Sequence, residues 1–148
     1  EFRRVLFRSQ QTSDITYRIF DWNRKDAEGN GRELHTDLAT DAIDFNSAGT
    51  SRIRVSPVLN KTENLVNCEF FTTNLIHFNE TIPKDYNLID SFVIYLCLEG
   101  EFMIRWNGNS ESVIKGETVL LPAMIRETDL VPSGEAKILE IFINEDIN

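Results

Sequence analysis

Short runs of alternating apolar and polar residues recur along most of this chain and predict β-strands. The runs cover residues 66–78, 91–98, 101–107, 111–114, 117–122 and 136–143, and turn-forming residues separate them. No second convincing helical pattern interrupts them. Turns that recur at intervals of about ten residues are typical of a β-sandwich or a β-barrel.

The run 91–98 is apolar at both odd and even positions, which predicts a strand buried on both faces. In the runs 101–107 and 136–143, one set of alternate positions is more apolar and is expected to point inward. These inward residues are Phe102, Ile104, Trp106, Leu139, Ile141 and Ile143. Glu99-Gly100 and Asn107-Gly108-Asn109 are expected to be tight turns between antiparallel neighbours.

The first 50 residues have a different pattern. β-Branched and aromatic residues predict a strand over 15–20, and the glycine-rich stretch 26–32 predicts a loop. Apolar residues then recur every three or four positions, which predicts a short helix over 33–45. The polar stretch 46–50 is expected to end this helix, so residues 46–52 are the best candidate for a domain boundary.

The first nine residues differ in charge from the rest of the chain. They carry three arginines and one glutamate, and the sequence does not begin with methionine. We expect residues 1–9 to be a non-native leader and leave them out of the fold prediction.

Composition narrows the possible functions. The 148 residues are 41% hydrophobic and carry a formal net charge of -9, which fits a soluble globular protein. This charge disfavours binding to nucleic acid or to an anionic membrane, because both are contacted by clustered Lys and Arg. There is no membrane-length apolar run and no secretion signal, so a cytoplasmic protein is expected. Cys68 and Cys97 are expected to be buried free thiols.

Two passages resemble known families. Residues 100–106 followed by 114–123 (IKGETVLLPA) resemble the second half of a cupin barrel. More specifically, residues 10–22 (QQTSDITYRIFDW), 31–35 (GRELH) and 41–45 (DAIDF) resemble short bacterial type I mannose-6-phosphate isomerases. The resemblance runs from Gln10 to the C-terminus. It implies that residues 10–50 end a catalytic cupin and form a linking helix, and that residues 51–148 form a C-terminal cupin-like jelly-roll barrel.

The resemblance also implies an activity, a cofactor and a site residue. The family interconverts mannose 6-phosphate and fructose 6-phosphate through an enediol, with Zn²⁺ near the sugar oxygens. A Gln/His pair, a Glu and a later His hold that zinc, and none of these positions exists in this sequence. The chain is therefore expected to be an inactive fragment of the enzyme. The family's active-site arginine falls on Arg18.

Physical chemistry supports a role for Arg18 independently of the family. Moving a proton between sugar carbons develops negative charge on oxygen, which a fixed guanidinium stabilises, or the same group can clamp a phosphate. The alternative is an arginine on the solvent face of an edge strand.

Other polar residues have simpler interpretations. His35 and His77 have no partner at metal-ligand spacing, and no metal site is expected in residues 52–148. A second set could form ion pairs and caps around a turn, or an acid/base group, and we favour the ion pairs. This set comprises Asp14, Asp21, Arg24, Arg32 and Glu33.

Two other functions remain open. A non-enzymatic cupin could bind a sugar or a protein partner, and a metal-dependent cupin oxygenase or epimerase would need ligands that this chain lacks. The sequence does not determine the oligomeric state, and in the isomerase interpretation the partner is a small sugar phosphate.

Overall fold

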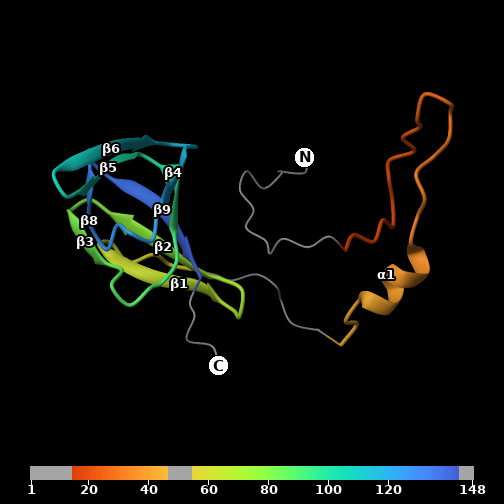
Figure 1. The fold of residues 1–148 in the computed structure, drawn as a ribbon, viewed down its shortest axis with the longest axis horizontal. Coiled ribbons are helices and arrows are strands. Elements are labelled where there is room, and N and C mark those ends of the chain that lie inside the picture. Colours follow the sequence, from red (N-terminus) through yellow and green to blue (C-terminus); the bar gives the residue numbers. More distant parts are fainter. Residues whose placement is uncertain (1–14, 47–54, 144–148) are drawn as a thin grey trace. The chain divides into compact units, whose positions relative to one another are not determined.

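The computed structural model describes residues 15–46 and 55–143, which excludes the nine residues expected to be a leader. The chain divides into two compact units, Glu1–Arg52 and Ile53–Asn148. Figure 1 shows a helix and a long loop in the first unit and a β-structure in the second.

The first unit contains the loop that the sequence predicts and a shorter helix than expected. Helix α1 spans Thr36–Ala42 rather than 33–45. The loop is closed by a bridge between Lys25 and Gly31. Within it, Asp26 Oδ1 accepts hydrogen bonds from the backbone N–H groups of Glu28 and Asn30, and Gly29 has a φ of 87°, a conformation that glycine adopts without strain.

The strand predicted over 15–20 is wrong. These residues belong to no strand, although β-branched and aromatic residues favour extended backbone. A strand needs a neighbouring strand for its backbone hydrogen bonds, and local preference alone cannot supply one. Here the backbone bonds of Arg18 go to His35 instead.

Within residues 55–143, the second unit forms nine antiparallel strands in two sheets. The five-stranded sheet has the order β1-β2-β9-β4-β7 and the four-stranded sheet the order β3-β8-β5-β6 (Figure 1). This is the predicted jelly-roll arrangement. The strands are β1 (Lys61–Asn67), β2 (Thr72–Phe78), β3 (Ile82–Asp85), β4 (Val93–Glu99), β5 (Glu101–Trp106), β6 (Asn109–Ile114), β7 (Thr118–Leu121), β8 (Glu127–Pro132) and β9 (Ala136–Phe142).

The strand predictions are confirmed for β2, β4, β5, β6, β7 and β9, whereas β1 was largely missed and β3 and β8 were missed altogether. The run 66–78 contains β2 but only the last two residues of β1, and the two strands are joined by a turn in which Cys68 N–H donates to the carbonyl of Phe71. β3 and β8 escaped prediction because Pro83, Lys84 and the acidic residues of β8 hide the alternation.

One predicted turn is confirmed and the other needs correction. Asn107 and Gly108, both with positive φ, join β5 to β6 as a tight hairpin. Glu99-Gly100 instead connects the two sheets, because β4 pairs with β7 and β9 whereas β5 pairs with β6 and β8.

The core lies between the two sheets. Phe102 and Ile104 point inward as predicted, and Trp106 packs against the core. β4 buries Val93, Tyr95 and Cys97 in the core. On its other face Leu96 is buried and Ile94 and Leu98 are half-buried, so the prediction of two buried faces holds in part.

The inward row predicted for β9 is wrong. The buried residues are Ala136, Ile138 and Glu140, and the alternate positions Leu139 and Ile141 point outward. The apolar outward row misled the prediction, because a glutamate inside a barrel is unusual.

Gly100 occupies a position where a side chain does not fit. Its φ is 77°, and a Cβ there would overlap the backbone carbonyl of Glu135. We expect Gly100→Ala to lower the free energy of unfolding by about 2 to 4 kcal/mol, because it adds overlap to backbone strain. Urea unfolding should measure this loss. The matched control is Gly108→Ala, which has a similar φ of 79° but open space around it; an equal loss in both variants would contradict the role of the overlap.

Candidate functional site

Arg18 is held between two parts of the first unit. Its backbone N–H donates to Nδ1 of His35 at 3.1 Å, and its carbonyl accepts from the N–H of His35 at 2.7 Å. Its guanidinium Nη1 donates to the carbonyl of Glu33 at 3.1 Å. The side chain is half-buried. The arginine is therefore positioned by residues just before helix α1, and most of its five N–H donors remain for a ligand.

The neighbouring charges form ion pairs around the turn, as the sequence analysis favoured. Asp21 Oδ1 lies 3.9 Å from Nε of Arg24, and Asp21 Oδ2 lies 3.8 Å from Nε of Arg32. The guanidinium of Arg24 also lies over the ring of Trp22. Glu33 contributes its carbonyl to Arg18. Asp14, the remaining member of that set, lies outside the described residues.

A buried polar cluster inside the barrel was not predicted. Glu140 is 1% exposed. Its carboxylate accepts hydrogen bonds from Asn74 Nδ2 at 2.8 Å and Tyr86 OH at 2.6 Å, and it pairs with Lys84 Nζ at 2.8 Å. The Tyr86 and Tyr95 hydroxyls also contact each other. A buried charge requires such partners, so this cluster is a structural centre of the barrel.

The same cluster keeps both tyrosines neutral. Burial, together with the charge of Glu140, raises the pKa of Tyr86 and of Tyr95 well above the usual value of about 10. Ionised tyrosine beside a buried carboxylate would place two negative charges in a dry interior.

Stability should therefore fall in alkaline solution. Because the folded pKa of both tyrosines lies above the unfolded one, their contribution is complete below pH ~10 and is lost as the pH rises further. Each tyrosine should remove about 1.4 kcal/mol of unfolding free energy per pH unit above that point. Urea unfolding at pH 8 to 11 measures this slope. Tyr95→Phe should halve it, and an unchanged slope in that variant would argue against the mechanism.

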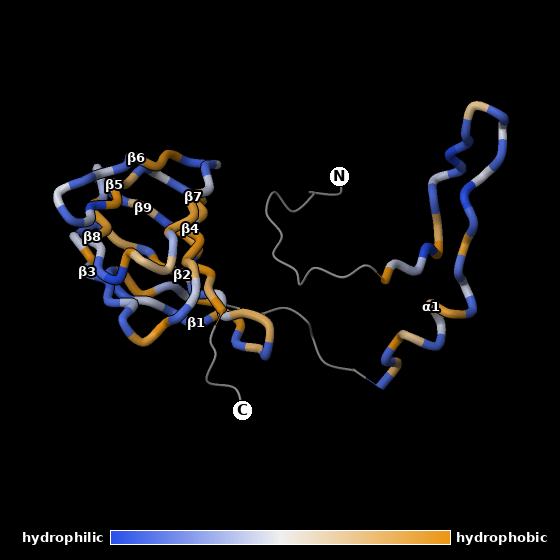
Figure 2. Tube along the Cα trace, viewed as in Figure 1, coloured by the Kyte–Doolittle hydropathy of each residue, from blue (hydrophilic) through white to orange (hydrophobic). Residues whose placement is uncertain are grey.

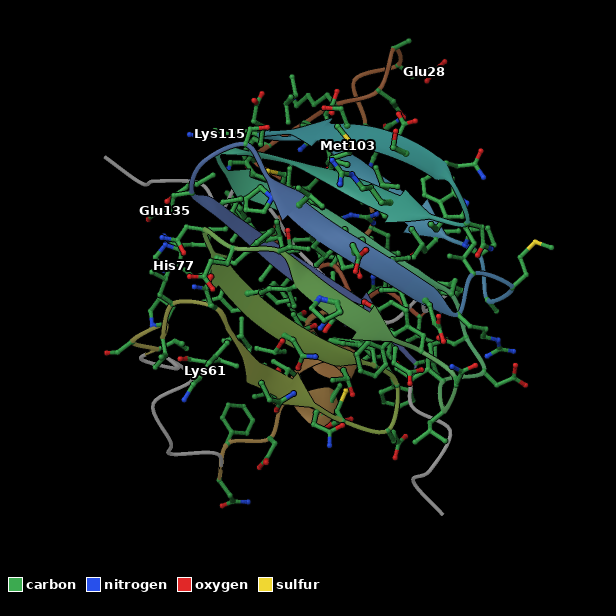
Figure 3. The ribbon with its side chains drawn as sticks, turned by 90° about the vertical axis from the view of Figure 1, so that its left-hand side faces the viewer. Glu28, Lys61, His77, Met103, Lys115 and Glu135 are labelled. Carbon is green, nitrogen blue, oxygen red and sulfur yellow. The ribbon has the colours of Figure 1, made fainter. Side chains whose placement is uncertain are left out.

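The histidines and cysteines offer no metal or nucleophile site. His35 accepts from the Arg18 N–H, and His77 pairs with Glu135 at 2.6 Å; Figure 3 shows these last two side chains side by side. Within residues 15–46 and 55–143, no three His, Cys, Asp or Glu side chains are placed to hold a metal ion. Cys97 is a buried free thiol whose pKa is raised by burial. Cys68 is free but only half-buried, which corrects the expectation for that residue.

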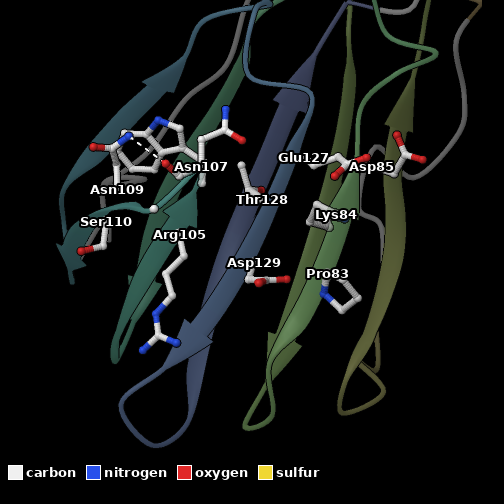
Figure 4. Close-up of a pocket in the computed structure, with 12 residues that line it drawn as sticks. Pro83, Lys84, Asp85, Arg105, Asn107, Asn109, Ser110, Glu127, Thr128 and Asp129 are labelled. Atoms are coloured by element: carbon white, nitrogen blue, oxygen red, sulfur yellow. Dashed lines mark hydrogen bonds between the residues drawn. The ribbon is translucent and has the colours of Figure 1, made fainter.

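A groove of about 670 Å³ is lined by β3, β8, β5 and the β5–β6 turn. Figure 4 shows that Asp85, Glu127 and Asp129 contribute carboxylates to it and that Arg105 and Lys84 contribute cations, of which Lys84 is already paired with Glu140. The excess of negative charge disfavours a phosphorylated ligand. The groove is thus a poor candidate for a sugar-phosphate site.

Sequence reasoning singled out Arg18 as a candidate site residue, but it did not predict the contacts of Arg18 or the cluster inside the barrel. His35 lies 17 positions from Arg18 and Asn74 lies 66 positions from Glu140. The only available signal was the lone acidic residue at Glu140 within an apolar strand.

Comparison with known sequences relates this chain to mannose-6-phosphate isomerases. The mannose-6-phosphate isomerase cupin domain family matches residues 61–143. The mannose-6-phosphate isomerase of Streptococcus mutans is 26% identical over 95% of this chain and 44% of its own length. The isomerase ManA of Bacillus subtilis is 29% identical over 85% of this chain and 40% of its own length. The chain therefore spans less than half the length of these curated relatives.

Solved structures show the same fold. The mannose 6-phosphate isomerase of Bacillus subtilis superposes with a TM-score of 0.59 at 24% identity, covering 87% of this chain and 40% of that one. A cupin superfamily protein of Desulfitobacterium hafniense gives a TM-score of 0.51 at 15% identity, covering 66% of this chain and 94% of that one. The predicted cupin fold is confirmed. No helix in the described parts of the chain has the length and apolarity needed to cross a membrane.

Proposed function

This chain belongs to the family of the mannose-6-phosphate isomerase cupin domain, and from that premise we propose that it forms part of an enzyme interconverting mannose 6-phosphate and fructose 6-phosphate. Two curated relatives of that name support the proposal because they align with most of this chain. The two free thiols fit the reducing cytoplasm, where we place the enzyme.

The described residues do not fit a zinc site. A catalytic zinc needs three protein ligands and an open position. The chain has only two histidines, and their ring nitrogens already contact Arg18 and Glu135. We therefore assign the zinc of the enzyme to a segment that this sequence does not contain.

Arg18 is the residue of this chain that we assign to the active site. The observation that carries this assignment is its anchoring: backbone bonds to His35 and the guanidinium bond to Glu33 fix its position. A pre-positioned guanidinium stabilises negative charge on a sugar oxygen or a phosphate without reorganising first. The barrel, whose interior is filled by side chains, serves as an accessory domain.

The 148-residue chain should bind no stoichiometric zinc and show no isomerase activity, because it lacks the ligand set and Arg18 cannot replace a Lewis acid. Metal analysis of the purified chain and an assay that detects fructose 6-phosphate formation measure both expectations. One zinc per chain, bound tightly, would contradict the assignment of the metal to another segment.

A further inference from the structure

The polar groove crosses one end of the four-stranded sheet, from β3 to the turn between β5 and β6. The strand register sets its central row, in which Asp129 lies beside Arg105 and Arg105 beside Ser110. Cross-strand neighbours point to the same side of a sheet. The alternate residues Ile104 and Leu130 fill the core, so this row lies on the outside of the barrel, where all three side chains are exposed.

Three charged side chains of the groove have no ion-pair partner in the described parts of the chain. They are Arg105, Glu127 and Asp129. Asp85 is partly engaged, because its Oδ1 accepts hydrogen bonds from the backbone N–H and the side-chain amide of Asn87, both at 2.8 Å. The three unpaired charges are therefore available to a ligand.

The groove offers hydrogen-bond donors as well as acceptors. Figure 4 shows amides on the β6 side of the groove and carboxylates on the β3 side, contributed by Asn107, Asn109, Asp85 and Glu127, with Asp129 between them. Figure 2 shows hydrophilic and neutral colours along the β5–β6 turn, unlike the strongly hydrophobic β4. A ligand that matches this lining must both donate and accept hydrogen bonds.

This mixture distinguishes three classes of small ligand. An ammonium group only donates hydrogen bonds, and it would meet the like charge of Arg105 in the central row. A phosphate mainly accepts hydrogen bonds, and it would meet three carboxylates. A sugar hydroxyl donates through its O–H to a carboxylate and accepts through its oxygen from a guanidinium. The lining therefore fits an uncharged ligand that is rich in hydroxyl groups.

Trp106 adds apolar surface to the same groove. This side chain packs against the core but is only half-buried, and it lines the groove. An aromatic ring offers a large apolar surface, on which the C–H groups of a sugar ring can pack while the hydroxyls reach the polar side chains. The groove volume of about 670 Å³ lies in the range of roughly 300 to 1,000 Å³ of small-molecule sites, which are frequent in the mouths of β-barrels.

We propose that this groove binds an uncharged saccharide. Trp106 contacts one face of the sugar ring, Asp129 accepts a hydrogen bond from one hydroxyl, and Arg105 donates a hydrogen bond to another. All residues that line the groove belong to the second unit. The inference therefore does not depend on Arg18 or on the proposed isomerase function, and it adds a ligand site to the barrel.

Tryptophan fluorescence tests the inference. The chain has two tryptophans, so Trp22→Phe leaves Trp106 as the single reporter. This 148-residue variant is titrated with methyl α-mannoside, methyl β-glucoside, maltose and cellobiose. At least one of these saccharides should change the Trp106 emission in a saturable way, with a Kd on the order of 1 mM. The absence of a saturable change with all four would overturn the inference.

Side-chain replacements in the same background locate the binding. Asp129→Ala should raise the Kd for the saccharide at least about tenfold, because a hydrogen bond to a charged group is lost, and Arg105→Ala should act in the same direction. The matched control is Glu101→Ala, which removes an exposed carboxylate of β5 outside the groove and should leave the Kd within about twofold. All three residues are exposed, so the urea midpoints should stay nearly constant. An unchanged Kd in both groove variants would refute the proposed site.

Two charged ligands test the chemical class with the same reporter. Spermidine represents a cation, and mannose 6-phosphate represents a phosphorylated sugar. The saccharide should bind more tightly than either. A response to spermidine alone would identify a cation site, and tighter binding of mannose 6-phosphate than of methyl α-mannoside would identify a phosphate site. Either result would overturn the assignment of an uncharged saccharide.

Discussion

Replacing Glu140 with leucine is expected to lower the free energy of unfolding by about 3 to 5 kcal/mol. The variant keeps an apolar side chain in the core but leaves the Lys84 ammonium without its counter-charge. It also removes the acceptor for Asn74 and Tyr86. Each of these groups is buried or nearly so, and a buried donor without a partner costs free energy.

Urea unfolding with a matched control measures this effect. Glu99→Leu removes a carboxylate that pairs with Lys137 on the surface, and it should leave the urea midpoint nearly unchanged because exposed pairs contribute little. A Lys84→Met/Glu140→Leu double variant should recover part of the loss, since neither buried charge remains. If Glu140→Leu were as mild as Glu99→Leu, the cluster would not be a structural centre.

The sequence predicted most strands of the barrel but not which side of β9 faces the core. Both sides of that strand carry apolar residues, because Ile138 faces the core while Leu139 and Ile141 lie on the opposite side of the sheet. Hydrophobic alternation distinguishes a buried side from a solvated one, and it cannot rank two apolar sides. Because Glu140 lies on the inward side of β9, that side was predicted to face solvent. Its partner Asn74 is 66 positions away in the sequence, so the sequence alone did not indicate the cluster.

Local preference failed at the other end of the chain for a different reason. Residues 15–20 have the composition of a strand but belong to no strand, and the backbone of Arg18 bonds to His35 instead. β3 was missed because it is four residues long and contains a proline. In both cases the structure depends on pairing with a distant segment, whereas amino-acid composition indicates only the local preference of one segment.

Arg18 was identified through the resemblance rather than through its pattern. An arginine between Tyr17 and Ile19 has no distinctive signature, and its neighbours give no indication that His35 and Glu33 hold it. The structure adds these contacts, which hold the backbone and the guanidinium of Arg18 in place. Its catalytic role is still a proposal and carries the largest consequence for activity.

The direct measurement is kcat and KM for mannose 6-phosphate in the longer, zinc-containing polypeptide, with Arg18 replaced. Arg18→Ala should lower kcat by roughly 100-fold to 1000-fold, the usual effect of losing one electrostatic donor to a transition state. Arg18→Lys should recover part of the rate because it keeps the charge but loses the planar fork. Zinc content and the melting curve should stay close to those of the unmodified enzyme.

Arg24→Ala is the matched control, because Arg24 is an exposed arginine of the same unit that pairs with Asp21. It should leave kcat within about twofold. If Arg18 stabilises the transition state, kcat should fall greatly for Arg18→Ala and hardly at all for Arg24→Ala. A kcat within about twofold of the unmodified enzyme in Arg18→Ala, with zinc bound and the fold intact, would rule out this role.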